Sequence, residues 1–195
     1  MPDVPSLLDL IGRIAGRDPR VLSRDALVTA SHELEDRYGV QRRTAPLLFG
    51  GFQRARFFAD DADRWARFAD RAAVAVVAYG ADGSPAQSPA EPLHALVVGR
   101  DDPFWRDWVC LAYGGERRSG VLVARDRRGD PDGPAGRRRC LAVLSHDHRV
   151  VRAAAVWVGH YLAGHDAALG ARWRRELAEV PIDLPRRRRR ATVLR

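Results

Sequence analysis

The chain has 195 residues, of which 46% are hydrophobic, so it can build a full core and wholesale disorder is excluded. No apolar run approaches the roughly 18 to 20 residues of a membrane span, the N-terminus lacks the features of a signal peptide, and two cysteines make no disulfide framework. We therefore expect a cytoplasmic protein without a membrane span. The net charge is +8, but residues 186–195 hold six arginines and no acid, which leaves the rest at +2 and implies no nucleic-acid-binding face on the body.

Two helices are expected in the first forty residues. Residues 5–16 predict a short amphipathic helix that stops at Gly16. Residues 24–38 predict a second helix, which Ser23 can cap and which Gly39 can end in a left-handed conformation. The apolar face of the first helix could contact a partner protein, pack on the core or pack on a second copy; its residues are Leu7, Leu8, Ile11 and Ile14.

Short apolar runs and helices alternate in the rest of the chain. The expected strands are 46–52, 73–80, 94–99, 108–114, 120–126 and 140–145. The expected helices run from Asp60 or Asp61 to about residue 72, from His146 to about Leu162, and over 166–180. This order predicts an α/β fold: a single mixed sheet of about five or six strands with packed helices, plus an N-terminal helix and a C-terminal helix with a basic tail.

Four blocks of the sequence resemble the DICT sensory domain. They are LSRDALVTASHELEDRY (22–38), the aromatic-rich stretch 46–80 around GFQ, DDPFWRDWVCLAYGG (101–115) and CLAVLSHDHRVVRAAAVWVG (140–159). Asp107 and Asp126 stand where the family is expected to have Glu, which keeps the charge but shortens the reach. The resemblance implies a non-enzymatic sensory or regulatory module, usually joined to an output domain such as a helix-turn-helix, kinase or cyclase. It supplies no ligand, so the cofactor stays unknown.

The resemblance divides the chain into four segments. They are an N-terminal helical extension (1–22), a DICT-like sensory domain (23–163), a C-terminal helix (164–183) and an Arg-rich disordered tail (184–195). The flanks are too short for an output domain, so we expect a stand-alone sensor that acts through a partner protein or a homodimer.

The candidate ligand site is an aromatic cleft. If Gly50 and Gly51 end a strand, the residues after them lie at a strand edge, where α/β proteins often bind ligands. Aromatic rings with one amide and one guanidinium could hold a planar or anionic small molecule or chromophore. The predicted ligand-binding residues are Phe52, Gln53, Arg56, Phe57, Trp105 and Trp108. The alternative is that both phenylalanines belong to the core and Arg56 is a surface or ion-pair residue.

Other reactive groups suggest weaker alternatives. The His146-Asp147-His148 run could bind a metal, but a helix start turns the two imidazoles apart, so capping is preferred and no metal is assigned. Cys110 and Cys140 lie among apolar strand residues and are expected to be buried thiols.

Two alternative functions are also open. An accessory transcription factor would contact nucleic acid through the tail residues Arg186, Arg187, Arg188, Arg189 and Arg190, although such runs are usually only solvated. An enzyme would use Asp107 and Asp126 with His94 or His160, but nothing in their spacing requires it.

Overall fold

A computed structural model describes residues 6–39, 46–82, 91–115, 118–127 and 138–180. Its helices are α1 (Leu7–Ala15), α2 (Arg24–Tyr38), α3 (Ala55–Ala59), α4 (Ala62–Ala69), the 3-10 turn η1 (Pro103–Trp105), α5 (His148–His165) and α6 (Ala167–Glu179). Its strands are β1 (Arg20–Ser23), β2 (Leu47–Arg54), β3 (Val74–Gly80), β4 (Leu93–Val98), β5 (Asp107–Tyr113), β6 (Ser119–Asp126) and β7 (Arg139–Ser145).

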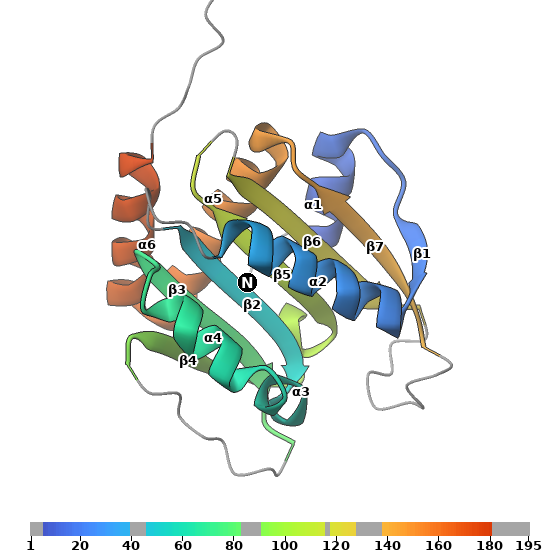
Figure 1. Cartoon of the computed structure of the whole chain (residues 1–195), viewed down its shortest axis with the longest axis horizontal. Coiled ribbons are helices and arrows are strands. Elements are labelled where there is room, and N and C mark those ends of the chain that lie inside the picture. Colours follow the sequence, from blue (N-terminus) through green and yellow to red (C-terminus); the bar gives the residue numbers. More distant parts are fainter. Residues whose placement is uncertain (1–5, 40–45, 83–90, 116–117, 128–137, 181–195) are drawn as a thin grey trace, which may run out of the picture.

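One mixed sheet of seven strands, in the order β1-β7-β6-β5-β2-β3-β4, forms the centre of the molecule (Figure 1). Strands β2, β3 and β4 are parallel, and every other neighbouring pair is antiparallel. The mixed α/β class is confirmed, whereas the expected five or six strands are too few. The missed strand is β1, which has only four residues, is exposed at Arg20 and Val21, and pairs with β7.

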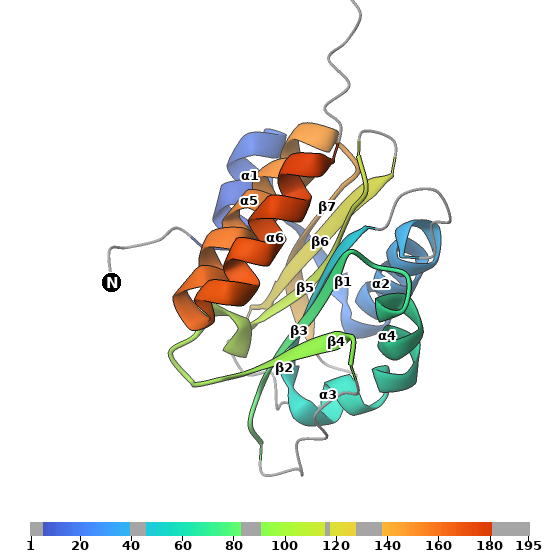
Figure 2. The same ribbon diagram turned by 90° about the vertical axis from the view of Figure 1, so that its left-hand side faces the viewer.

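Helices cover both faces of the sheet, so the molecule has three layers (Figure 2). Helices α1, α5 and α6 lie on one face, and α2, α3 and α4 on the other. Successive residues of a strand point to opposite faces of the sheet. Phe49 therefore packs in the core under α1, α5 and α6, and Leu48 packs in the core under α2, α3 and α4. Strands buried on both faces explain the near-continuous apolar runs in the sequence.

The N-terminal helix packs on the core of the domain, which decides among the three alternatives for its apolar face. Leu7 and Ile11 of α1 are fully buried in the same cluster as Val151 and Val158 of α5. Of the four apolar residues that the sequence placed on the face of this helix, only Ile14 is exposed, at 43%. At the other end of the chain, the Trp173 indole of α6 donates a hydrogen bond of 2.8 Å to the Ala155 carbonyl of α5. Both flanking helices therefore share the core of the predicted sensory domain.

The helix boundaries follow the predicted caps with one exception. Ser23 Oγ accepts a hydrogen bond from the Ala26 amide at 3.2 Å, as expected for the start of α2. Gly16 ends α1 in the left-handed conformation. Gly39 does not: its φ is −74°, and the predicted left-handed stop is wrong there. Close packing explains this glycine, because a Cβ would lie 2.7 Å from the Glu35 carbonyl oxygen.

No helix in the described ranges is long and apolar enough to cross a membrane. The Arg-rich segment 184–195, with its five predicted nucleic-acid contacts, lies outside the described residues.

Candidate ligand site at one end of the sheet

The β4–β5 connection crosses the edge at which the parallel strands β2 and β3 end. Ligands of open α/β sheets commonly bind at this edge. Here η1 covers it: Phe104 is fully buried, with its ring 4.8 Å from that of Phe49, and the Trp105 ring lies so close to Gly80 that a side chain there would collide with it. The protein's own turn thus covers part of the edge where a site was predicted.

Gln53 is the most unusual residue at this edge. It is 1% exposed, and its φ of 62° is left-handed, a conformation that costs a non-glycine residue about 1–2 kcal/mol. Its amide nitrogen donates to the Arg106 carbonyl at 2.5 Å, and its amide oxygen accepts from Arg138 Nη2 at 2.9 Å. The pairing of β2 with β3 shifts register between Gly51 and Arg54, around Gln53. One buried side chain therefore ties β2 to the start of β5 and to the residue before β7.

Two buried arginines surround Gln53. Arg138, 5% exposed, places Nε 3.1 Å from the Asp126 carboxylate, which is buried as well. Arg54, 4% exposed, donates through Nη1 to the carbonyl oxygens of Gln53 at 2.8 Å and Trp105 at 3.0 Å. Its guanidinium carbon lies 3.8 Å from the centre of the Trp105 ring, within cation–π distance. These contacts fix η1 on the end of β2.

A second ion pair lies on the face of the sheet that α1, α5 and α6 cover. Asp107 is fully buried and accepts from Arg125 Nε at 2.5 Å and Nη2 at 2.7 Å. Burial raises the pKa of Asp107 above its ordinary value, more than the Arg125 guanidinium lowers it. Because Asp107 and Asp126 point to opposite faces, the structure does not bring together the carboxylate pair that an enzyme would need.

Three predicted site residues lie on or beside the core that α2, α3 and α4 cover. Phe52 is 8% exposed and packs edge-on against Phe58 and Trp65, as the core alternative proposed. Trp108, half-buried, faces Phe52 across the β2–β5 pair. Phe57, also half-buried, has the Arg138 guanidinium carbon 5.7 Å from its ring centre.

The other predicted residues lie around the same end of the sheet. Arg56, with a side chain 47% exposed, approaches the Asp82 carboxylate to 4.0 Å. Trp105 lies on η1, and Gln53 lies beneath it in the polar network. The six predicted residues thus gather at one end of the sheet, but Phe52 and Gln53 are buried rather than part of an open wall.

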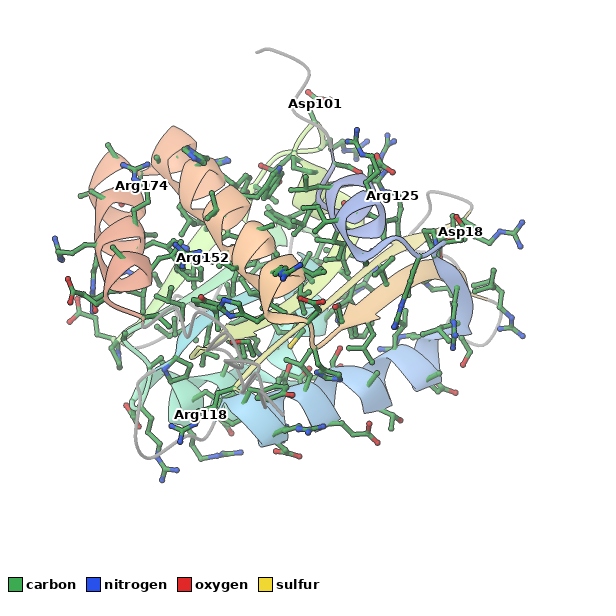
Figure 3. All side chains as sticks on the ribbon, turned by 90° about the horizontal axis from the view of Figure 1, so that it is seen from above. Asp18, Asp101, Arg118, Arg125, Arg152 and Arg174 are labelled. Atoms are coloured by element: carbon green, nitrogen blue, oxygen red, sulfur yellow. The ribbon has the colours of Figure 1, made fainter. Side chains whose placement is uncertain are left out.

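A pocket of about 580 Å³ opens next to this network. It is lined by Arg100, Asp101, Asp102, Pro103, Arg106, Arg125, Asp126 and Arg127. Figure 3 shows Asp101 and Arg125 at the same end of the molecule. The lining is charged and contains none of the predicted aromatic residues, so this pocket has a different character from the expected cleft.

The histidine and cysteine groups form no comparable site. His146 Nδ1 is 3.1 Å from the Tyr38 hydroxyl, whereas the His148 ring stacks on Tyr113 and Asp147 caps α5. Among the described residues, no three histidine, cysteine or acidic side chains could hold a metal. The thiols of Cys110 and Cys140 are buried, which raises the pKa of each.

Residues 5–127 match the family described as the sensory domain in diguanylate cyclases and two-component systems, DICT. The chain belongs to the DICT family. No curated protein and no solved structure matches it significantly. The predicted family is confirmed, and the protein contains a sensory domain; three of the four blocks lie within the match, and the block 140–159 follows it.

The range that matches the family contains Gln53, Arg54, Asp107 and Asp126. It ends before Arg138. Sequence reasoning did not select Arg54 or Arg138 for the site. Arg54 stands within the selected GFQRARFF stretch and Arg138 ends an expected loop, but neither position differs in pattern from the many surface arginines.

Proposed function

We propose that this DICT domain is a non-enzymatic intracellular sensor that binds a small molecule at the end of β2 and signals through a protein partner or a second copy. The observation that supports it is Gln53, a buried amide in a left-handed backbone that joins three segments of the chain. Strained residues persist where the surroundings hold them, and they cluster at ligand and switch sites.

The predicted residues take two roles in this proposal. Trp105, Trp108, Arg56 and Phe57 keep exposed surface and would contact the ligand. Phe52 and Gln53 lie buried behind them and would change their contacts when the ligand binds. A ligand that competes for the Gln53 amide would weaken the hydrogen bond from this amide to the Arg106 carbonyl. Arg106 is the residue directly after η1. It can shift η1 only by the difference in its affinity for the two positions of the turn.

Native mass spectrometry and an absorbance spectrum of protein purified from its own host test the proposal. We expect a stoichiometric mass above the 21.7 kDa of the chain. Trp105→Ala and Arg56→Ala should lose that mass, and Arg67→Ala, an exposed arginine of α4, should keep it. A bare chain in every preparation would contradict tight ligand binding and favour a module that only contacts other proteins.

A further inference from the structure

We propose that the charged pocket beside η1 binds the phosphate group of a small phosphate monoester through Arg100, Arg106 and Arg127. The inference deepens the proposed function and rests on it, because the pocket borders the turn that the Gln53 network holds in place. It goes further in naming the chemistry of the ligand and three residues that were not predicted.

Most of the acidic side chains in and behind the pocket already have partners. Asp126 pairs with the buried guanidinium of Arg138. Asp102 accepts from the Phe104 amide at 2.8 Å and the Tyr161 hydroxyl at 2.9 Å, and lies 3.2 Å from His165 Nε2.

Arg125 is also paired, since its Nε and Nη2 both donate to the buried carboxylate of Asp107. These ion pairs form part of the wall of the pocket.

The charges outside these two ion pairs are three guanidinium groups and the carboxylates of Asp101 and Asp102. Arg100, Arg106 and Arg127 are exposed, and within the described ranges none of them forms a salt bridge. Asp101 and Asp102 oppose them, so the pocket, with its Arg125–Asp107 and Arg138–Asp126 pairs included, carries a net charge of +1. A phosphate monoester carries about −1.5 to −2 at neutral pH and presents three oxygens to planar guanidinium donors. The charge of the ester is opposite in sign to the net charge of the pocket.

The backbone that carries these arginines is ordered before any ligand arrives. Asp102 caps η1, and the Asp102 amide donates to the Gly99 carbonyl at 3.1 Å, which orders the turn between Arg100 and Arg106. The Arg127 amide donates to the Arg139 carbonyl at 3.0 Å, at the end of β6. An ordered backbone lowers the entropic cost of gathering their side chains around an anion.

Titration calorimetry with the full chain tests the inference, with phenyl phosphate as the probe and phthalate as a carboxylate control that is also a dianion. We expect wild type to bind phenyl phosphate more tightly than phthalate, because only the phosphate presents three oxygens on one centre to the three guanidinium groups. Arg106→Gln and Arg127→Gln should each weaken binding about tenfold, the effect of losing one charge-assisted hydrogen bond. Both residues are exposed, so the variants should keep the circular dichroism of wild type.

Two further variants exclude binding by arginines elsewhere. Arg149→Gln changes an exposed arginine of α5 outside the pocket, and a variant with Gln at all of 186–190 removes the basic tail. Both should bind phenyl phosphate like wild type. Loss of binding in the tail variant, equal loss in Arg149→Gln, or equal affinity for phthalate would each overturn the inference.

The outcomes also separate this inference from the proposed function. A host-derived ligand without phosphate that Trp105→Ala releases would leave the sensor proposal standing and refute the phosphate site. Failure of both experiments would refute both.

Discussion

Replacing Gly80 with alanine should push η1 off the end of the sheet. Gly80 is the last residue of β3, and a Cβ built on it would collide with two carbons of the Trp105 ring and lie 2.9 Å from the Gln53 carbonyl oxygen. Because η1 is held on both sides by Phe104 and by Arg54, the ring cannot move away without cost. Overpacking of this kind costs about 1–3 kcal/mol. We therefore expect Gly80→Ala to lower the free energy of unfolding by that amount.

Urea unfolding followed by far-UV circular dichroism measures this change independently of indole fluorescence. The double variant Gly80→Ala, Trp105→Ala removes the ring that the new methyl group meets. It should be more stable than the sum of the single changes predicts, by about 1 kcal/mol. The relief should be incomplete, because the Gln53 carbonyl stays close. A cost below about 0.5 kcal/mol for Gly80→Ala, or strict additivity of the two changes, would refute the packing of Trp105 on Gly80.

Three more outcomes are expected from urea or thermal unfolding. Gln53→Gly should be more stable than Gln53→Ala by about 0.5–1 kcal/mol, since relief of the left-handed backbone exceeds the extra chain entropy of glycine; equal stabilities would show that Gln53 is unstrained. Burial raises the pKa of Glu35 above its ordinary 4.5. Wild type should therefore lose stability relative to Glu35→Gln as the pH rises from about 4 towards 7. A difference in stability between the two proteins that does not change with pH would contradict this. Burial lowers the pKa of His146 below 6.5, so the sign reverses: wild type should lose stability relative to His146→Gln as the pH falls from 7.5 to about 5, and parallel melting curves at both ends would be inconsistent with it.

Sequence patterns predicted the elements whose signals are local. The helix over 24–38 begins and ends where expected, because Ser23 caps it and its buried face repeats at helical spacing. Six strands were found because each is an apolar run. Strand β1 was not, since its sequence RVLS carries no strong strand signal and its partner lies about 120 positions away.

The structure gathers the six predicted site residues at one end of the sheet, and whether they bind a ligand there stays a prediction. The aromatic stretch after β2 indicated that these residues would lie close together. It gave no sign that η1 would fold over that edge or that Gln53 would adopt a left-handed backbone. Buried and exposed arginines look alike in a chain with so many of them, so Arg54 and Arg138 became visible only through their contacts.

The pairing of β1 with β7 has a consequence for how the chain folds. During synthesis, α1 and β1 emerge first, but their neighbours α5 and β7 begin only at His148 and Arg139. Contacts so distant in sequence form late and slow the folding of a domain. The range that matches the DICT family ends at residue 127, before either partner, so a fragment cut there would leave Leu7 and Ile11 without the helix that buries them. We expect that fragment to aggregate, whereas a chain extended through α6 should fold as a unit.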